Sequence, residues 1–228
     1  MKVIIASIMR DAEGYLGRYV AQTSTLKHYL DERGDSLGLV VAEGDSTDNT
    51  LALLQRWERS VGGVSVLKLD HGGPKYGSVD VPARWRQIAG VYNRLFDAIC
   101  EIQGMDAVLH VEADLIWDAG TMLALLDHLG DAFPVVSPMI FSKAGAFYDT
   151  YGHRAEGVRF IHDQPYHQKL ADWDGGLVRI DSAGNCQAML AEVARRCRFS
   201  EETVLLGPSI YAEGYSQWLD PGLKVIHP

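Results

Sequence analysis

Signals for buried strands and for helices alternate through the first half of the chain, and this alternation constrains the fold more than any other feature. Short apolar runs, rich in β-branched residues, occupy residues 2–8, 37–42, 64–69 and 107–111. Apolar side chains at helical spacing fill residues 13–33, the segment after residue 48, and residues 83–103. Such alternation predicts an α/β fold with a mostly parallel sheet flanked by helices.

The second half of the chain is less regular and more aromatic. A helix is predicted over residues 120–129 and a strand over 134–137, followed by a segment dense in aromatic residues, His and Gly over 141–176. No repeat or linker divides the sequence, so we expect residues 1–228 to form a single domain. Because loops on a rigid scaffold usually carry specificity, we expect the irregular half to build the acceptor side of a cleft.

Composition excludes several classes of function. The 228 residues include 21 Lys and Arg against 30 Asp and Glu, a net charge of −9, which is unlike a generic polyanion-binding protein. Cys100, Cys186 and Cys197 lack metal-finger spacing. No apolar run approaches the roughly 20 residues of a membrane helix, and the apolar start lacks a cleavage site. We therefore expect a soluble, cytoplasmic protein with no transmembrane segment.

Acidic residues follow two of the predicted strands. Glu112 and Asp114 come directly after the fourth strand, and residues 43–48 follow the second. Ligands of parallel sheets bind at the carboxyl ends of strands, where both turns lie. Alternation aims Glu112 and Asp114 the same way, and carboxylates are the ligands that Mg²⁺ and Mn²⁺ prefer. A merely solvated turn is the alternative.

Two further features could join such a site. A carboxylate in the turn 43–50 could accept hydrogen bonds from a nucleobase or ribose, although Ser46, Thr47 or Asp48 could instead cap the next helix. His227, near the end of the chain, could offer an imidazole nitrogen to the same cation, although a terminal histidine is usually inert.

Several segments, in the right order, resemble the inverting GT-A glycosyltransferases. Residues 40–50 (VVAEGDSTDNT) resemble their nucleotide-binding turn, and residues 109–118 (LHVEADLIWD) resemble their strand with its DxD motif. Arg84, Arg86 and Asn93 match the helix between these motifs. Residues 147–154 (FYDTYGHR) and 214–227 are similar to segments of fungal capsule and cell-wall mannosyltransferases.

The resemblance implies a GT-A (Rossmann-like) fold and a role for each matching residue. Contacts to the donor nucleotide are expected from Ser7, Glu43, Asp45, Arg86, Asn93, Glu112 and Ala113. Ligands of a Mn²⁺ or Mg²⁺ cofactor are expected from Asp114, His227 and Glu112. Sugar and acceptor contacts are expected from Asp149, Arg154, Trp173, Gly184 and Asn185. The acceptor-activating base would be Glu202 or its neighbour Glu201. Glu112 and Glu202 stand where many relatives carry Asp.

The predicted activity is metal-dependent transfer of a sugar, with inversion, from a UDP- or GDP-sugar to an acceptor hydroxyl. Transfer builds negative charge on the departing diphosphate, which a cation stabilises, while a carboxylate takes the acceptor's proton. The acceptor could be a glycan, a protein or modified DNA, and the oligomeric state is open.

Alternative functions depend on other parts of the sequence. A viral-type enzyme acting on hydroxymethylated DNA bases could use Arg195, Arg196 and Arg198, together with Arg84 and Arg86, as phosphate contacts. A solvated helix face is the default explanation of the basic cluster 195–198. A nucleotidyltransferase would need a glycine-rich triphosphate loop, which does not follow the first strand. A non-catalytic nucleotide-sugar-binding module would need no base. Aromatic residues between 147 and 173 could stack on sugar rings or simply pack a core.

Overall fold

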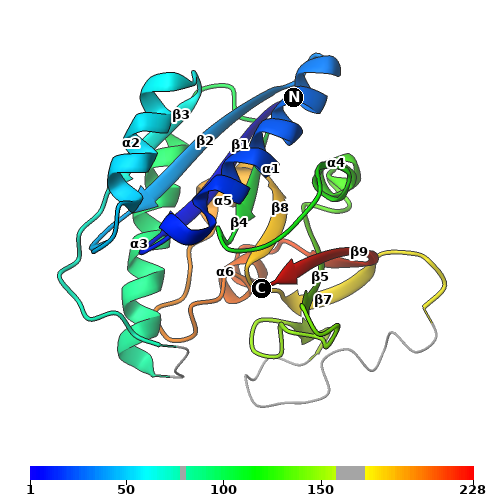
Figure 1. Ribbon diagram of the computed structural model, residues 1–228. Coiled ribbons are helices and arrows are strands. Elements are labelled where there is room, and N and C mark those ends of the chain that lie inside the picture. The colour runs from blue at the N-terminus through cyan, green and yellow to red at the C-terminus, as the bar shows by residue number, and fades with distance from the viewer. Residues whose placement is uncertain (78–80, 158–172) are drawn as a thin grey trace.

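A computed structural model of the chain describes residues 1–77, 81–157 and 173–228 (Figure 1). Its helices are α1 (Glu13–Glu32), α2 (Thr50–Ser60), α3 (Pro82–Cys100), α4 (Ala119–His128), α5 (Ala191–Arg196) and α6 (Gly207–Ala212). Its strands are β1 (Lys2–Met9), β2 (Ser36–Glu43), β3 (Val64–Lys68), β4 (Ala107–Val111), β5 (Val135–Ser142), β6 (Arg154–Ala155), β7 (Val178–Ser182), β8 (Cys186–Leu190) and β9 (Gln217–His227).

All of these strands join one sheet in the order β3-β2-β1-β4-β8-β5-β9-β7-β6. The pairs β2–β3, β1–β2 and β1–β4 are parallel, so the carboxyl ends of these four strands lie at one edge. β8 runs antiparallel between β4 and β5, and β9 runs parallel to β5. The predicted α/β sheet is confirmed, with its parallel part in the first half of the chain.

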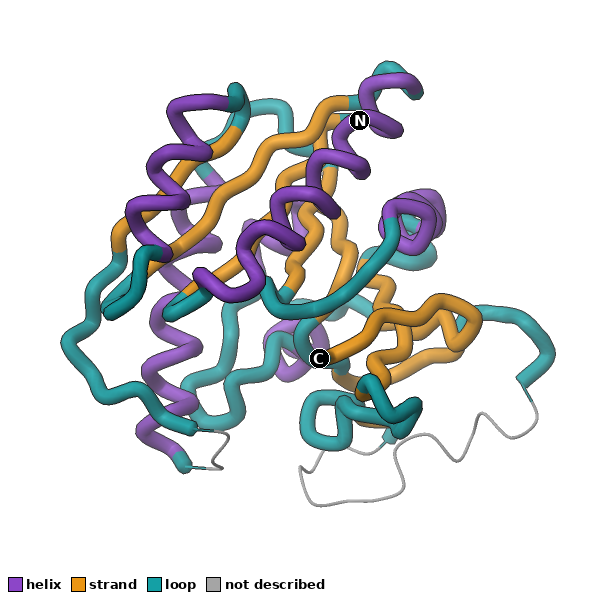
Figure 2. The backbone as a smooth tube through the Cα atoms, in the orientation of Figure 1, coloured by secondary structure: helices purple, strands orange, loops and turns teal. Residues whose placement is uncertain are grey.

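Alternate residues of β1 enter two different cores. Val3 and Ile5 belong to the core that α1, α2 and α4 cover, whereas Ile4 and Ala6 belong to the core under α3, α5 and α6. Strands therefore lie between two helical layers (Figure 2). A strand buried on both faces is apolar at most positions, which explains the near-continuous apolar run of β1.

The second half is more regular than the sequence predicts, because it contributes β5 to β9. β9 runs back beside β5 and brings the C-terminus to the centre of the molecule (Figure 1). There Ile226 and Ile116 exchange two backbone hydrogen bonds of 2.8 and 2.9 Å. This bridge fastens the end of β9 to the segment that follows β4, and so joins two regions that are distant in the sequence.

Four members of the predicted aromatic and histidine cluster, Phe160, His162, Tyr166 and His167, lie outside the described residues. Cys100, Cys186 and Cys197 are free thiols. In the part of the chain that the structure describes, no helix combines the length and apolar character needed to cross a bilayer.

Candidate functional site

Glu112, Asp114 and His227 meet where the end of β9 crosses the segment after β4. One donor atom from each of the three lies within 4.8 Å of the others. The Nε2 atom of His227 lies 3.3 Å from Oδ2 of Asp114. The Ile116–Ile226 bridge explains this convergence, because it fixes His227 one residue beyond the crossing.

The residues present fit a hard divalent cation. Oδ1 of Asp114 is buried and has no hydrogen-bond partner among the described residues, so it is free to act as a ligand. Burial, the charge of Asp114 and the charge of Asp149 raise the pKa of Glu112 to about 8. A bound cation would lower this pKa again, because its positive charge favours the ionised carboxylate. Two carboxylates with one imidazole form a donor set that suits Mn²⁺.

Neighbouring side chains hold both halves of this cluster in place. From α1, Nη2 of Arg18 donates to the carbonyl of Asp114 over 2.6 Å, and Gln22 donates to the carbonyl of Leu115. Tyr148 stacks on the imidazole of His227 with 3.8 Å between ring centroids and 10° between planes. The acidic segment and the C-terminal imidazole are therefore oriented independently of any ligand.

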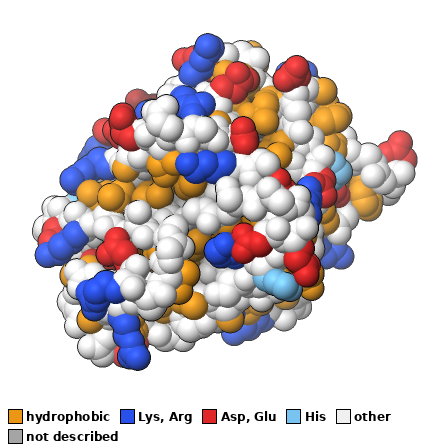
Figure 3. Space-filling model, turned by 90° about the horizontal axis from the view of Figure 1, so that it is seen from above, with side chains coloured by type: hydrophobic (Ala, Val, Ile, Leu, Met, Phe, Trp, Pro, Cys, Tyr) orange, Lys and Arg blue, Asp and Glu red, His pale blue; other side chains and the backbone are white. Residues whose placement is uncertain are grey.

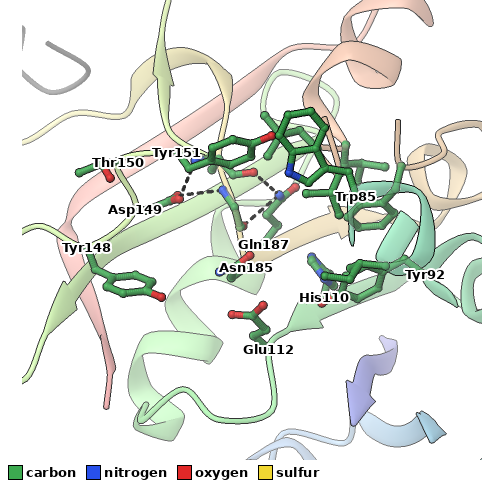
Figure 4. Close-up of a pocket in the computed structure, with 18 of the residues that line it drawn as sticks. Trp85, Tyr92, His110, Glu112, Tyr148, Asp149, Thr150, Tyr151, Asn185 and Gln187 are labelled. Atoms are coloured by element: carbon green, nitrogen blue, oxygen red, sulfur yellow. Dashed lines mark hydrogen bonds between the residues drawn. The ribbon is translucent and has the colours of Figure 1, made fainter. Parts of the chain in front are cut away.

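A cavity of about 320 Å³ adjoins the cluster (Figure 4). It is lined by α3, β4, residues 148–152, the turn 183–187 and the loop 199–206. The carboxylate of Glu112 points into the space between Tyr148 on one side and Tyr92 with His110 on the other (Figure 4). The cavity therefore opens beside the cation-binding carboxylates, where a ligand could contact both.

Asp149 shapes one wall of this cavity by joining two glycine turns. Its carboxylate accepts hydrogen bonds of 2.9 Å from the N–H of Gly152 and 2.8 Å from the N–H of Gly184. A Cβ at Gly152 would lie 2.7 Å from the Cα of Gly184, so the two turns touch and neither tolerates a side chain. Burial nevertheless raises the pKa of Asp149 to about 6, because these N–H groups offset only part of the desolvation.

A second cavity of about 200 Å³ lies at the carboxyl ends of the parallel strands. Its lining includes Met9 at the end of β1, Gly44 after β2 and Lys75 in the loop after β3. Arg84 of α3 lines both cavities, and its guanidinium makes no hydrogen bond within the described part of the chain. A cationic fork between two adjacent cavities is suited to phosphate groups of a ligand that fills both.

The structure brings together some of the residues predicted for the site. Glu112, Asp149, Gly184 and Asn185 line the larger cavity, and the N–H of Glu112 donates to the carbonyl of Asn185. Ala113 lies between the acidic residues with its side chain in the core.

The predicted nucleotide turn flanks the smaller cavity. Glu43 is buried, and it accepts a hydrogen bond from the N–H of Ser46. The carboxylate of Asp45 accepts hydrogen bonds from the N–H groups of His71 and Gly72. These bonds lower the pKa of Asp45, and the bond from His71 has the larger effect. In this structure both carboxylates accept backbone hydrogen bonds that stabilise the turn and the neighbouring loop, and Gly44 between them lines the cavity.

Other predicted residues lie elsewhere or have structural partners. The hydroxyl of Ser7 is buried against Tyr19 and the carbonyl of Val111. Arg86 is exposed on α3, and the amide of Asn93 exchanges two hydrogen bonds with the backbone of Phe199.

The same holds for four residues of the second half. Arg154 is buried and donates to the carbonyls of Thr150 and His153. The indole of Trp173 donates to the carbonyl of Gly176, away from both cavities. Glu201 and Glu202 are exposed, on a loop whose neighbouring residues line the larger cavity.

In the basic cluster on and after α5, Arg195 and Arg196 are exposed, whereas Arg198 has partners within the protein. Arg198 pairs with Asp97 at 2.8 Å and also donates to backbone carbonyls. On the face shown in Figure 3, basic and acidic side chains are interspersed.

Sequence reasoning missed three residues that form the inner end of the larger cavity: Tyr92, His110 and Gln187. A signal existed for one of them, since His110 interrupts the otherwise apolar strand β4. Arg84, which the resemblance groups with Arg86 and Asn93 on one helix, lines both cavities, whereas Arg86 lines neither.

Comparison with solved structures identifies the fold. The mannosyltransferase PcManGT from Pyrobaculum calidifontis, in complex with GDP-Man and Mn²⁺, matches with a TM-score of 0.60 and 12% identity over 98% of this chain and 56% of its own. GalNAc-T7 with UDP, GalNAc and Mn²⁺ matches with a TM-score of 0.59 and 13% identity over 100% of this chain and 44% of its own. No protein-family model and no curated sequence matches the chain.

These similarities confirm the GT-A fold predicted from the sequence. The chain spans about half the length of the two solved structures. At such low identity the likeness establishes the fold alone, so the activity must be argued from the site of this chain.

Proposed function

We propose that residues 1–228 act as one glycosyltransferase domain, which moves a sugar from a UDP- or GDP-sugar to an acceptor hydroxyl with inversion and depends on Mn²⁺ or Mg²⁺. The observation that carries the proposal is the convergence of Glu112, Asp114 and His227 within 4.8 Å. These residues would hold the cation beside two cavities that share Arg84. Both solved structures with this fold contain Mn²⁺ with a nucleotide or nucleotide sugar, which supports the same chemistry here.

The two cavities divide a nucleotide sugar between them. The smaller one, at the ends of β1 and β2, would receive the nucleoside, and Arg84 would clamp the diphosphate where the cavities adjoin. The larger one would receive the sugar against the turn of Gly184 and Asn185. A divalent cation bound at this place stabilises the negative charge that develops on a departing diphosphate.

Inversion requires a base on the side of the sugar opposite the diphosphate. Asp149 lines the cavity, but its carboxylate already accepts from Gly152 and Gly184. We therefore retain Glu202, with Glu201 as the alternative, because their loop borders the cavity through Phe199 and Val204. Both glutamates are exposed in this structure, so either must turn inward to meet an acceptor hydroxyl.

Release of nucleoside diphosphate from a panel of UDP- and GDP-sugars tests the proposal. We expect at least one donor to be turned over with Mn²⁺ and none after chelation. Asp114→Asn should abolish turnover while circular dichroism is unchanged. Asp131→Asn, the same change at an exposed position, serves as the matched control. Turnover that survives both chelation and Asp114→Asn, or pyrophosphate release from a nucleoside triphosphate instead, would contradict the proposal.

A further inference from the structure

The inner end of the larger cavity contains buried polar groups that the fold does not use. Tyr92, His110 and Gln187 line it, and they are only 3%, 1% and 1% exposed. The hydroxyl of Tyr92, both ring nitrogens of His110 and Oε1 of Gln187 have no hydrogen-bond partner within the described residues. Buried polar groups are almost always paired, because leaving them unpaired is costly. Three of them on one cavity wall therefore point to a ligand.

These three side chains come from adjoining elements and face the same space. His110 of β4 lies opposite Gln187 of β8 in the antiparallel register, so the two side chains are neighbours on one face of the sheet. Tyr92 of α3 covers this pair, with 4.7 Å between its ring centroid and that of His110. Figure 4 shows the two rings side by side at one end of the cavity. We call these three side chains the polar floor.

Packing holds the polar floor rigid before any ligand arrives. Phe199 stacks on Tyr92 with 4.5 Å between centroids and contacts His110 at 5.1 Å. The amide nitrogen of Gln187 donates to the carbonyls of Ala183 and Gly184, which leaves Oε1 as the free atom. Polar atoms fixed in this way can bind a ligand group without losing side-chain entropy.

The chemistry of the polar floor selects a neutral polyol. A phenol and an imidazole can each donate and accept a hydrogen bond, and an amide oxygen accepts, which suits hydroxyl groups that do both. Two carboxylates, those of Glu112 and Asp149, line the cavity against one guanidinium, that of Arg84, so the balance of charged side chains disfavours an anionic group at the polar floor. Trp85 and Tyr151 line it as well, and they supply apolar faces for the C–H bonds of a ring.

We propose that Tyr92, His110 and Gln187 bind ring hydroxyl groups of a neutral sugar and thereby select which sugar the cavity accepts. The inference rests on the proposed function for the identity of the ligand. It adds to that function a set of specificity-determining residues on α3, β4 and β8, which line the same cavity as Glu112 of the cation-binding cluster. The sugar could belong to the donor or to the acceptor, and these two sources share the same hydroxyl chemistry.

Calorimetric titrations of the full chain with Mn²⁺ distinguish these sources. The donor arm compares UDP with UDP-glucose and UDP-GalNAc, and GDP with GDP-mannose. The acceptor arm titrates methyl mannoside and methyl glucoside into protein that is saturated with the nucleoside diphosphate. The test variant is Tyr92→Phe, which removes one hydroxyl and keeps the ring. Tyr29→Phe on α1, where the side chain is 45% exposed, is the matched control.

In the donor arm, Tyr92→Phe should weaken binding of the nucleotide sugar by about tenfold and leave binding of the nucleoside diphosphate unchanged, which corresponds to one lost hydrogen bond. In the acceptor arm, only the affinity for the methyl glycoside should fall by that factor. A loss in either arm supports the proposal and identifies the source. Equal sugar affinities for wild type and variant in both arms overturn it.

Thermal unfolding of the free protein supplies an independent reading. Because the Tyr92 hydroxyl has no hydrogen-bond partner among residues 1–77, 81–157 and 173–228, its removal should leave the melting temperature unchanged or raise it. A lower melting temperature with unchanged sugar affinity would show that the hydroxyl is structural, and would overturn the proposal.

If Tyr92→Phe does not fold, His110→Phe serves as the test variant, and the same loss of sugar affinity is expected. Failure of any nucleoside diphosphate to bind with Mn²⁺ would instead refute the proposed function, and methyl glycosides titrated into the free protein would still decide whether the floor binds sugar.

Discussion

The stacking of Tyr148 on His227 yields a quantitative prediction for cation affinity. His227 ends β9, and the ring of Tyr148 holds its imidazole with 3.8 Å between ring centroids, while Oδ2 of Asp114 lies 3.3 Å from Nε2. An aromatic pair of this kind is worth about 0.5–1.5 kcal/mol. Removing it in Tyr148→Ala frees the imidazole, so Mn²⁺ affinity should fall roughly two- to twelvefold. Tyr148→Phe keeps the ring and should bind Mn²⁺ as the wild type does.

Electron paramagnetic resonance of free Mn²⁺, titrated with protein, measures this affinity without any nucleotide. Tyr29→Ala on α1 controls for the loss of a partly exposed tyrosine. Circular dichroism must confirm that each variant keeps the wild-type fold. Equal Mn²⁺ affinities for Tyr148→Ala and the wild type would refute the reasoning, and so would a Phe variant as weak as the Ala variant.

Three further predictions concern the cavities. Arg84→Met should weaken nucleoside diphosphate binding in calorimetry by roughly 10- to 100-fold, through loss of charge-assisted hydrogen bonds, whereas Arg86→Met on the exposed side of α3 should have no effect. Gly184→Ala places a Cβ 2.8 Å from Oδ1 of Asp149 and should cost about 1–3 kcal/mol in urea unfolding, while Gly14→Ala, with open space around it, should not destabilise. Burial raises the pKa of Asp149 from 3.8 to about 6, so the native state binds this proton more tightly than the unfolded state does. Relative to Asp149→Asn, the free energy of unfolding of the wild type should therefore fall by about 3 kcal/mol between about pH 4 and pH 6. A rise of this free energy across the same range would contradict the assignment.

Local sequence patterns predicted the parallel half of the sheet because its strands are buried on both faces. β1 and β4 are apolar along almost their whole length, and this leaves little ambiguity. β8 carries no comparable signal. It contains Gln187, follows a glycine turn and owes its place to antiparallel pairing with β4 and β5. Pairing between segments so distant in the sequence cannot be read from either segment alone.

The convergence of Glu112, Asp114 and His227 likewise could not be predicted from local sequence patterns. Period-two alternation suffices to aim Glu112 and Asp114 in one direction, but no local pattern connects them with His227. That connection came from a family resemblance, and its structural cause is the bridge between Ile116 and Ile226.

Helix geometry explains which residues of α3 belong to the site. Arg84, Ile88 and Tyr92 line the larger cavity at intervals of four residues. Arg86 lies two positions from Arg84 and so faces another direction. Asn93 follows Tyr92 by one position and contacts Phe199 instead. Spacing along the helix could have selected Arg84 over Arg86, had the face of α3 toward the cavity been known.

The most direct test of the account is a calorimetric titration of UDP and GDP into the protein, first with Mn²⁺ and then with EDTA. If Asp114 and His227 hold a cation that binds the diphosphate, one nucleotide should bind much more tightly with Mn²⁺. Asp114→Asn and His227→Ala should each remove that gain. Binding that is equally tight in EDTA, or a gain from Mn²⁺ that survives both substitutions, would contradict the account.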